Sequence, residues 1–149
     1  MINTKIYLCG GIKDLSDEEA SEWRNKAIDE LENRPREFKK GLKNTSCVRQ
    51  FKCLDPMRRN FRDDEFQSQN EIVQLDKADI IACDIMIVNA TKPSWGTAME
   101  ILFAFEHNKI VVCFTGNDYE ETSPWVAFHS TRVCETMKEA VTYIRDLKC

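Results

Sequence analysis

The sequence lacks long hydrophobic runs, a basic cluster and a typical secretion signal. Its longest apolar stretches are strand-sized and interrupted by charge, so no segment is expected to span a bilayer. The N-terminus has no long apolar region and is expected to form a strand rather than a signal peptide. Lysine and arginine number 21 against 25 aspartates and glutamates, and the net charge is -4. Because nucleic-acid surfaces normally carry a positive stripe, we expect neither nucleic acid nor membrane as a partner.

The sequence also lacks the cysteine and histidine spacings that are typical of metal sites. It has no CxxC pair, and His107 and His129 lack ligand spacing to any cysteine. The cysteine count of seven is odd, and several cysteines sit in apolar strand-like runs, where a free thiol behaves as a small hydrophobic group. We therefore expect a reduced, cytoplasmic protein without a structural metal. Cys9, at the end of the first predicted strand, is a minor candidate for a nucleophile.

Strand-like and helix-like segments alternate along the whole chain. Ser16 and Glu19 form a capping-box pattern at the start of the first helix. The four predicted strands lie within 5–12, 46–56, 84–90 and 109–116, and the predicted helices lie within 16–33, 63–83, 92–105 and 135–147. The segment 34–49 is polar and basic and is predicted to be a loop. This alternation predicts one domain over 1–149 with an α/β fold, a Rossmann-like or flavodoxin-like parallel sheet flanked by helices.

Ligands of such sheets bind at the carboxyl ends of the strands. The loops that follow the predicted strands should therefore line one cleft. They are 9–12, 54–59, 89–96 and 115–128.

Three polar residues are candidates for chemistry at this cleft. Glu100 is expected in the first turn of the helix after the third strand, with Ser94 or Gly96 as the N-cap, where the helix dipole favours an ionised carboxylate. Tyr7 lies near the end of the first strand, from which its hydroxyl could reach the same cleft. Asp76 falls mid-helix, where aspartate has a poor propensity and no cap to explain it. The alternatives are a Glu100 that only complements the dipole, a core or edge Tyr7 and a solvated Asp76.

Four stretches in sequence order make the chain similar to a known family. They read "YLCGGI", "LDPMRR", "EIVQLDKADI" and "PSWGTAMEI". Together they resemble the nucleoside 2-deoxyribosyltransferase family, which includes the nucleoside 5'-monophosphate N-glycosidases. The resemblance covers roughly residues 4–145 and is looser over 33–50.

The resemblance implies roles for the three candidates. Glu100 matches the family's nucleophilic carboxylate, which attacks the anomeric carbon and holds a covalent deoxyribosyl intermediate. Tyr7 matches the tyrosine that positions this carboxylate, and Asp76 matches the aspartate that assists protonation of the departing base. Such chemistry needs a carboxylate beside the developing oxocarbenium ion and a second acid for the leaving group, but no metal or organic cofactor.

The resemblance also implies a substrate-binding set. The glycine pair matches a loop that passes close to the sugar or phosphate, and Asp55 with Arg58 or Arg59 matches the base side. The expected contacts come from Gly10, Gly11, Ile12, Asp55, Arg58, Asn89, Ser94, Trp95, Gly96, Met99 and Ser130. Family loops equivalent to the one near Ser130 and His129 often reach into a neighbouring subunit, so a homodimer or higher homo-oligomer is expected. Trp95 and Trp125 could stack on a base, or serve only as hydrophobic cover.

Ser94 bears on which substrate is used. At this position the nucleoside-specific transferases carry an acid, whereas the monophosphate-cleaving members carry a serine. Ser94, Lys92 and the free amides of a helix N-terminus would attract a phosphate that an aspartate would repel. The alternative is that Ser94 is only an N-cap.

The sequence leaves four readings of function open. The first is transfer of a deoxyribosyl group from a deoxynucleoside or its 5'-monophosphate to a free base. The second is hydrolysis of a nucleoside 5'-monophosphate, with water as the acceptor. A non-catalytic nucleotide sensor is a third reading. A lysine-decarboxylase-like phosphoribohydrolase is a fourth, weakened because the paired glycine of that family is replaced by Pro93-Ser94-Trp95-Gly96.

Overall fold

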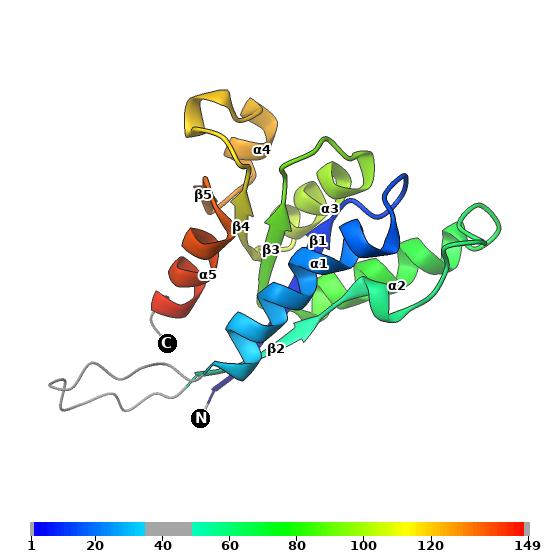
Figure 1. Cartoon of the computed structure of the whole chain (residues 1–149), viewed down its shortest axis with the longest axis horizontal. Coiled ribbons are helices and arrows are strands. Elements are labelled where there is room, and N and C mark those ends of the chain that lie inside the picture. The colour runs from blue at the N-terminus through cyan, green and yellow to red at the C-terminus, as the bar shows by residue number, and fades with distance from the viewer. Residues whose placement is uncertain (1, 35–48, 148–149) are drawn as a thin grey trace, which may run out of the picture.

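A five-stranded parallel sheet forms the centre of the computed structural model, which describes residues 2–34 and 49–147. The strand order is β2-β1-β3-β4-β5, and every neighbouring pair runs parallel (Figure 1). The strands are β1 (Ile2–Gly10), β2 (Arg49–Leu54), β3 (Ile85–Asn89), β4 (Ile110–Phe114) and β5 (Arg132–Cys134). The predicted α/β fold with a parallel, helix-flanked sheet is confirmed.

Helices cover both faces of this sheet. They are α1 (Asp17–Ile28), α2 (Gln69–Ala82), α3 (Trp95–Glu106), α4 (Pro124–Phe128) and α5 (Met137–Asp146). Three shorter helical segments are the π-helical η1 (Asp29–Asn33) and the 3-10 helices η2 (Pro56–Arg58) and η3 (Tyr119–Glu121). One buried cluster joins β1 to α1 and α5, and a second joins β1 to α2 and α3. Because side chains alternate along a strand, Ile6 and Leu8 enter the first cluster while Tyr7 and Cys9 enter the second.

The start of α1 follows the sequence prediction. The Ser16 hydroxyl accepts a hydrogen bond from the Glu19 amide at 3.1 Å, and the Glu19 carboxylate accepts one from the Ser16 amide at 3.0 Å. Both hydrogen bonds of the capping box are therefore present.

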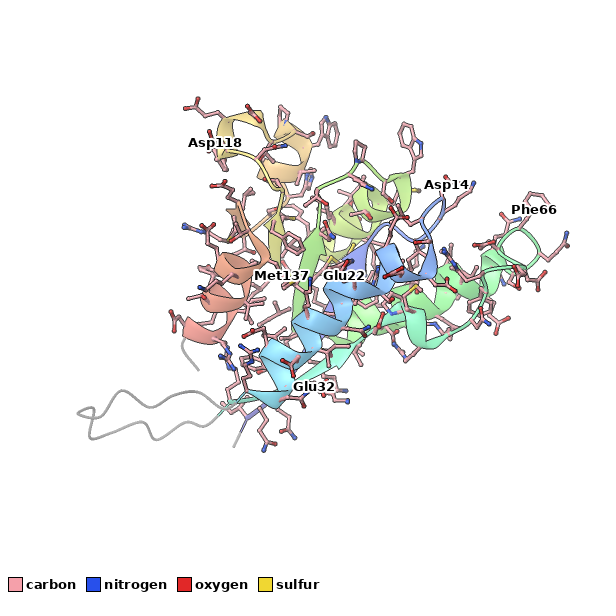
Figure 2. The ribbon with its side chains drawn as sticks, in the orientation of Figure 1. Asp14, Glu22, Glu32, Phe66, Asp118 and Met137 are labelled. Atoms are coloured by element: carbon pink, nitrogen blue, oxygen red, sulfur yellow. The ribbon has the colours of Figure 1, made fainter. Side chains whose placement is uncertain are left out.

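Three elements differ from the sequence prediction. The strand β5 was not expected, because its three residues, Arg132–Cys134, contain no apolar run and gain their order by pairing with β4. Helix α2 begins at Gln69 instead of Asp63, and residues 62–68 form turns, from which the exposed side chain of Phe66 projects (Figure 2). Part of the predicted 115–128 loop is the short helix α4, which opens with Pro124 in its first turn.

Two further predictions concern parts of the chain outside the described residues. These are most of the predicted loop over 34–49 and the start of the second predicted strand, at 46–48. Within residues 2–34 and 49–147, no helix combines the length and the apolar content needed to cross a bilayer.

From β1 the chain adds β2 on one side of the sheet, and then β3, β4 and β5 on the other side, so the topological switch point lies between β1 and β3. Helix α1 connects β1 to β2 on one face, whereas α2 and α3 lie on the other face. The carboxyl ends of β1 and β3, at Gly10 and Asn89, pair side by side at this point. In open parallel sheets such a switch point leaves a crevice in which ligands bind.

Candidate active site

Glu100 reaches the switch point from α3. The Ser94 hydroxyl caps this helix by accepting a hydrogen bond from the Thr97 amide at 3.4 Å, as one of the two predicted caps. With Trp95 as the first helical residue, Glu100 is the sixth, so it lies in the second turn and not in the first as predicted. The helix dipole acts mainly within the first turn, so dipole matching alone does not explain a half-buried acid at this position.

Two donors from β1 hold the Glu100 carboxyl. The Tyr7 hydroxyl donates to Oε1 at 3.3 Å, and the Cys9 thiol donates to Oε2 at 2.9 Å. Both side chains are 0% exposed. They stand two residues apart on one strand and therefore project from the same face of the sheet. The tyrosine and the glutamate, separated by 93 residues in sequence, meet as the sequence analysis expected.

Burial governs the titration of this carboxyl. It raises the pKa of Glu100 from its ordinary 4.5 to about 7, while the hydrogen bonds from Cys9 and Tyr7 and the charge of Arg24 act in the opposite direction. From the sequence, the helix terminus was expected to keep this carboxyl ionised. Desolvation outweighs that contribution, because Glu100 lies one turn beyond the free amides.

Asp76 lies on α2 in an ion-pair network. Its Oδ1 is 2.5 Å from Nη2 of Arg59, whose Nη1 is 2.7 Å from Oδ2 of Asp79. Arg58 also reaches Asp79, at 2.6 Å. Burial raises the pKa of Asp76, and the pairing with Arg59 opposes that rise. The Tyr7 hydroxyl also favours the ionised form of Asp76, and the charge of Asp76 is one cause of the raised pKa of Glu100. Asp76 is therefore not a solvated helix residue.

A cavity of about 490 Å³ opens in front of these groups. Glu100 and Asp76 both line it, as do Gly10 at the end of β1 and residues from the segments that follow β1, β2 and β3. Its apolar wall is formed by Pro56, Met57, Phe61, Ile72 and Val73. The volume suits a nucleoside-sized ligand, and the apolar wall provides surface against which a planar ring can pack.

Some of the predicted binding residues reach this cavity. Gly10 and Ile12 line it at and just after the end of β1, and Ser94 and Gly96 line it at the start of α3. Of the two arginines considered, Arg59 lines it and Arg58 does not.

The other predicted binding residues have different surroundings. Asp55 pairs with Arg24 and accepts from the Met57 amide, and Asn89 accepts from the amide and hydroxyl of Thr91. The residues outside the cavity lining are Gly11, Asp55, Arg58, Asn89, Trp95, Met99 and Ser130. The predicted 115–128 loop contributes no residue to this lining either, because β4 and β5 carry it away from the β1–β3 crevice.

Trp95, Met99 and Ser130 were expected to contact substrate. The side chains of Trp95 and Met99 are instead 90% and 73% exposed to solvent. The Ser130 hydroxyl donates to the Val126 carbonyl at 2.6 Å and lies 3.1 Å from the Cys113 sulfur. A contact of Ser130 with the site of a second subunit stays a prediction.

Two arginines that the sequence analysis did not single out organise the cavity walls. Arg24 is 0% exposed, donates to the Gly10 carbonyl at 2.9 Å and lies 3.5 Å from Asp55. Arg62 donates to the Ile12 carbonyl at 2.6 Å and to the Leu15 carbonyl, so it ties two walls of the cavity together. Arg24 falls four residues after Ala20 and three before Ala27, on the apolar face of α1, and a charged residue at such a position was a signal that could have identified it. No local signal marked Arg62.

The two glycines after β1 differ in what surrounds them. A Cβ at Gly10 would lie 2.9 Å from an indole carbon of Trp23, so packing against α1 excludes a side chain there. A Cβ at Gly11 would meet nothing closer than 3.5 Å, from Leu15. The close approach that was expected at the substrate is thus, at Gly10, an approach to a neighbouring helix.

Comparison with known proteins relates this architecture to solved structures. The 2-deoxyribosyltransferase from Bacillus psychrosaccharolyticus is 14% identical, covers 97% of this chain and 93% of its own, and superposes with a TM-score of 0.65. A conserved protein from Enterococcus faecalis V583 is 15% identical, with coverages of 95% and 97% and a TM-score of 0.64. A CMP N-glycosidase from Clostridium botulinum is 18% identical, with coverages of 95% and 98% and a TM-score of 0.56. At these identities the three structures show a shared fold.

The sequence itself carries the family assignment. None of the curated proteins compared with this chain matches it significantly. The family model described as nucleoside 2-deoxyribosyltransferase, however, matches residues 6–139. Because that match spans most of the sequence, the chain belongs to the nucleoside 2-deoxyribosyltransferase family.

Proposed function

We propose that the chain is an enzyme that cleaves the N-glycosidic bond of 2'-deoxynucleosides or their 5'-monophosphates and transfers the deoxyribosyl group to another base. One observation carries this proposal. A carboxyl group, Glu100, is held by two hydrogen bonds from β1 at the wall of a cavity that a second acid, Asp76, also lines. A sensor that only binds nucleotides would have no need for this arrangement.

In the first step, Glu100 acts as the nucleophile. One carboxylate oxygen forms a bond to the anomeric carbon of the sugar while the bond from that carbon to the base nitrogen breaks. The electron pair of the broken bond goes to the base, which takes a proton from Asp76. The adjacent negative charge stabilises the oxocarbenium character of the transition state. The product is a glycosyl ester of Glu100 and a free base.

In the second step, an acceptor releases the sugar from Glu100. A nitrogen of a second base attacks the anomeric carbon, the ester bond breaks and its electron pair returns to the carboxylate. If water attacks in place of a base, the enzyme is a hydrolase. The family includes both kinds of member, and the resemblance to a CMP N-glycosidase fold keeps hydrolysis as the alternative.

The environment of Ser94 favours a phosphorylated substrate among the two classes. Ser94 lines the cavity at the N-terminus of α3, where free backbone amides attract anions. Lys13 also lines the cavity and brings positive charge to its rim, whereas the lining arginines Arg59 and Arg62 are paired with Asp76 and Asp17. A 5'-phosphate could therefore bind near the start of α3 while the sugar faces Glu100.

A comparison of base release and base exchange tests the proposal. The purified protein is incubated with deoxynucleosides and with deoxynucleoside 5'-monophosphates, with and without a second base, and the products are separated by chromatography. Exchange of the base supports transfer, and release without exchange supports hydrolysis. If no base is released or exchanged from either substrate class, the enzymatic proposal fails.

The Glu100→Ala variant tests the assigned nucleophile. We expect loss of base release and loss of any covalent sugar adduct that mass spectrometry detects on the wild-type protein. Glu106→Ala is a matched control, because Glu106 is an exposed residue at the far end of the same helix. If Glu100→Ala keeps most of the wild-type activity, Glu100 is not the nucleophile.

A further inference from the structure

The thiol of Cys9 lies against the carboxyl group that we assign as the nucleophile. Its sulfur is 2.9 Å from Oε2 of Glu100, and the only other acceptor within reach among the described residues is the Thr97 carbonyl, at 4.0 Å. Cys9 is 0% exposed and sits at the carboxyl end of β1, next to Val88 of β3. Pairing with β3 fixes the backbone of β1 at Cys9, and pairing with β2 extends along β1 as far as Tyr7.

The surroundings of Cys9 suit a donor and not a nucleophile. Burial and the nearby Glu100 carboxyl raise the pKa of the Cys9 thiol well above its ordinary value. The protonated thiol has one hydrogen to donate, and the carboxylate oxygen is a pure acceptor. The early candidate role of Cys9 as a nucleophile is therefore disfavoured, since the thiolate is the reactive form.

We propose that Cys9 is a positioning residue for Glu100, whose carboxyl it clamps together with Tyr7. The hydroxyl of Tyr7 holds Oε1 and the thiol of Cys9 holds Oε2, so both oxygens are restrained by one strand. Rotation of the carboxyl about its last torsion would break both bonds at once. The carboxyl plane is thus fixed relative to the sheet before a substrate arrives.

A thiol is well suited to this task for a chemical reason. A strong donor on a carboxylate oxygen lowers its pKa and also its nucleophilicity, whereas a thiol is a weak donor. Cys9 therefore orients Oε2 with little loss of reactivity. Because the hydrogen bond favours the ionised carboxylate, it also opposes the rise in pKa that burial causes.

The inference rests on the proposed function only in calling Glu100 the nucleophile, and its test needs no activity. In protein labelled with carbon-13 at the glutamate carboxyl, the Glu100 signal is identified by its absence in Glu100→Gln. Its titration midpoint in the wild type is expected near pH 7. Cys9→Ala should move the midpoint to higher pH by about 0.5 to 1, because the ionised form loses one donor. Cys9→Ser keeps a donor, and a hydroxyl is a stronger donor than a thiol, so its midpoint should lie at or below that of the wild type.

Cys83→Ala is the matched control. Cys83 is 1% exposed and belongs to the same buried cluster, but its thiol donates to the Ile80 carbonyl at 3.1 Å. Its removal should leave the Glu100 midpoint within about 0.2 of the wild type, although it deletes the same atom. Where Cys9→Ala does not fold, Cys9→Val fills the space without a donor and carries the same expectation. A midpoint that is the same in Cys9→Ala or Cys9→Val as in the wild type overturns the proposal.

Kinetics provide the second readout. We expect Cys9→Ala to lower kcat for base release about tenfold with KM changed less than threefold, because positioning acts on the transition state more than on binding. The acidic limb of the pH profile should move upward with the Glu100 midpoint in Cys9→Ala. Cys9→Ser, which keeps a donor, should show no upward shift and should recover part of the lost kcat. If the midpoint shifts but the wild-type protein releases no base, the proposed function fails while the clamp stands. Unchanged kcat and an unmoved acidic limb in Cys9→Ala would refute the positioning role.

Discussion

The raised pKa of Glu100 predicts that replacing this residue by glutamine stabilises the protein at neutral and alkaline pH. The folded state holds a proton on Glu100 up to about pH 7, whereas the unfolded chain loses it near 4.5. As the pH rises through this window, the unfolded state binds fewer protons than the folded state, so the free energy of unfolding falls. The loss is complete above about pH 7. A glutamine at this position has no charge to bury and escapes the loss.

The magnitude follows from the two pKa values. A rise from 4.5 to about 7 corresponds to about 3 kcal/mol. Solvent in the adjoining cavity reduces this, and the amide of glutamine matches only one of the two donors, Tyr7 and Cys9, as well as a carboxylate does. We therefore expect Glu100→Gln to be more stable than the wild type by about 1–2 kcal/mol at pH 8, equivalent to a Tm higher by roughly 2–8 °C.

Chemical denaturation of both proteins between pH 4 and pH 8 is the assay. All other titrating groups are common to the two proteins and cancel in the difference. The advantage of Glu100→Gln should be absent or reversed at pH 4 and should grow until about pH 7. Glu106→Gln, an exposed substitution on the same helix, should show no such growth above pH 5. A difference between Glu100→Gln and the wild type that does not change with pH would refute the reasoning.

Three further outcomes are expected. Ser94→Asp should shift the preference from deoxynucleoside monophosphates towards deoxynucleosides, because a carboxylate at the start of α3 repels a phosphate. If the ratio of kcat/KM for the monophosphate to kcat/KM for the nucleoside does not change, Ser94 is only a helix cap. Gly10→Ala should lower the free energy of unfolding by about 1–3 kcal/mol, because the new Cβ would lie 2.9 Å from an indole carbon of Trp23. Gly11→Ala, whose Cβ would lie 3.5 Å from the nearest atom, should change it by only about a few tenths of a kcal/mol. Arg59→Met removes the cation, 2.5 Å from Asp76, that lowers the pKa of this carboxyl. The alkaline limb of the pH profile of base release should therefore move to higher pH, and an unmoved limb contradicts Asp76 as the acid.

Much of the fold could be predicted from local pattern. The buried strands are nearly continuous apolar runs, and Ser16 with Glu19 marks the start of α1. Such signals depend on residues close in sequence. Strand β5 and the start of α2 carried no comparable signal, because the first is set by pairing with β4 and the second by the turns over 62–68.

In the candidate site, too, some contacts could be predicted from the sequence and others could not. Strand alternation and the strand-loop-helix order predicted Tyr7 and Glu100 at one cleft, and the family resemblance implied their contact. The contact of Cys9 with Glu100 spans 91 residues, and the link from Arg62 to Ile12 spans 50. Contacts of this kind depend on the register between elements. Periodicity does not encode that register, so these contacts could not be read from the sequence.

The environments of the two acids assign them different chemistry. Among the residues that the structure describes, Glu100 accepts hydrogen bonds from two neutral donors and forms no ion pair, and burial brings its pKa to about 7. Asp76 is also partly desolvated, but it shares Arg59 with Asp79. A carboxylate without a bound cation keeps its lone pairs available for attack, whereas one paired to arginine is a poorer nucleophile. The pair therefore works as nucleophile and proton donor only if substrate binding loosens the Arg59 contact and lets Asp76 take up the proton that the base requires. That requirement makes Arg59, rather than Arg58, the arginine whose position should respond to the base in the cavity.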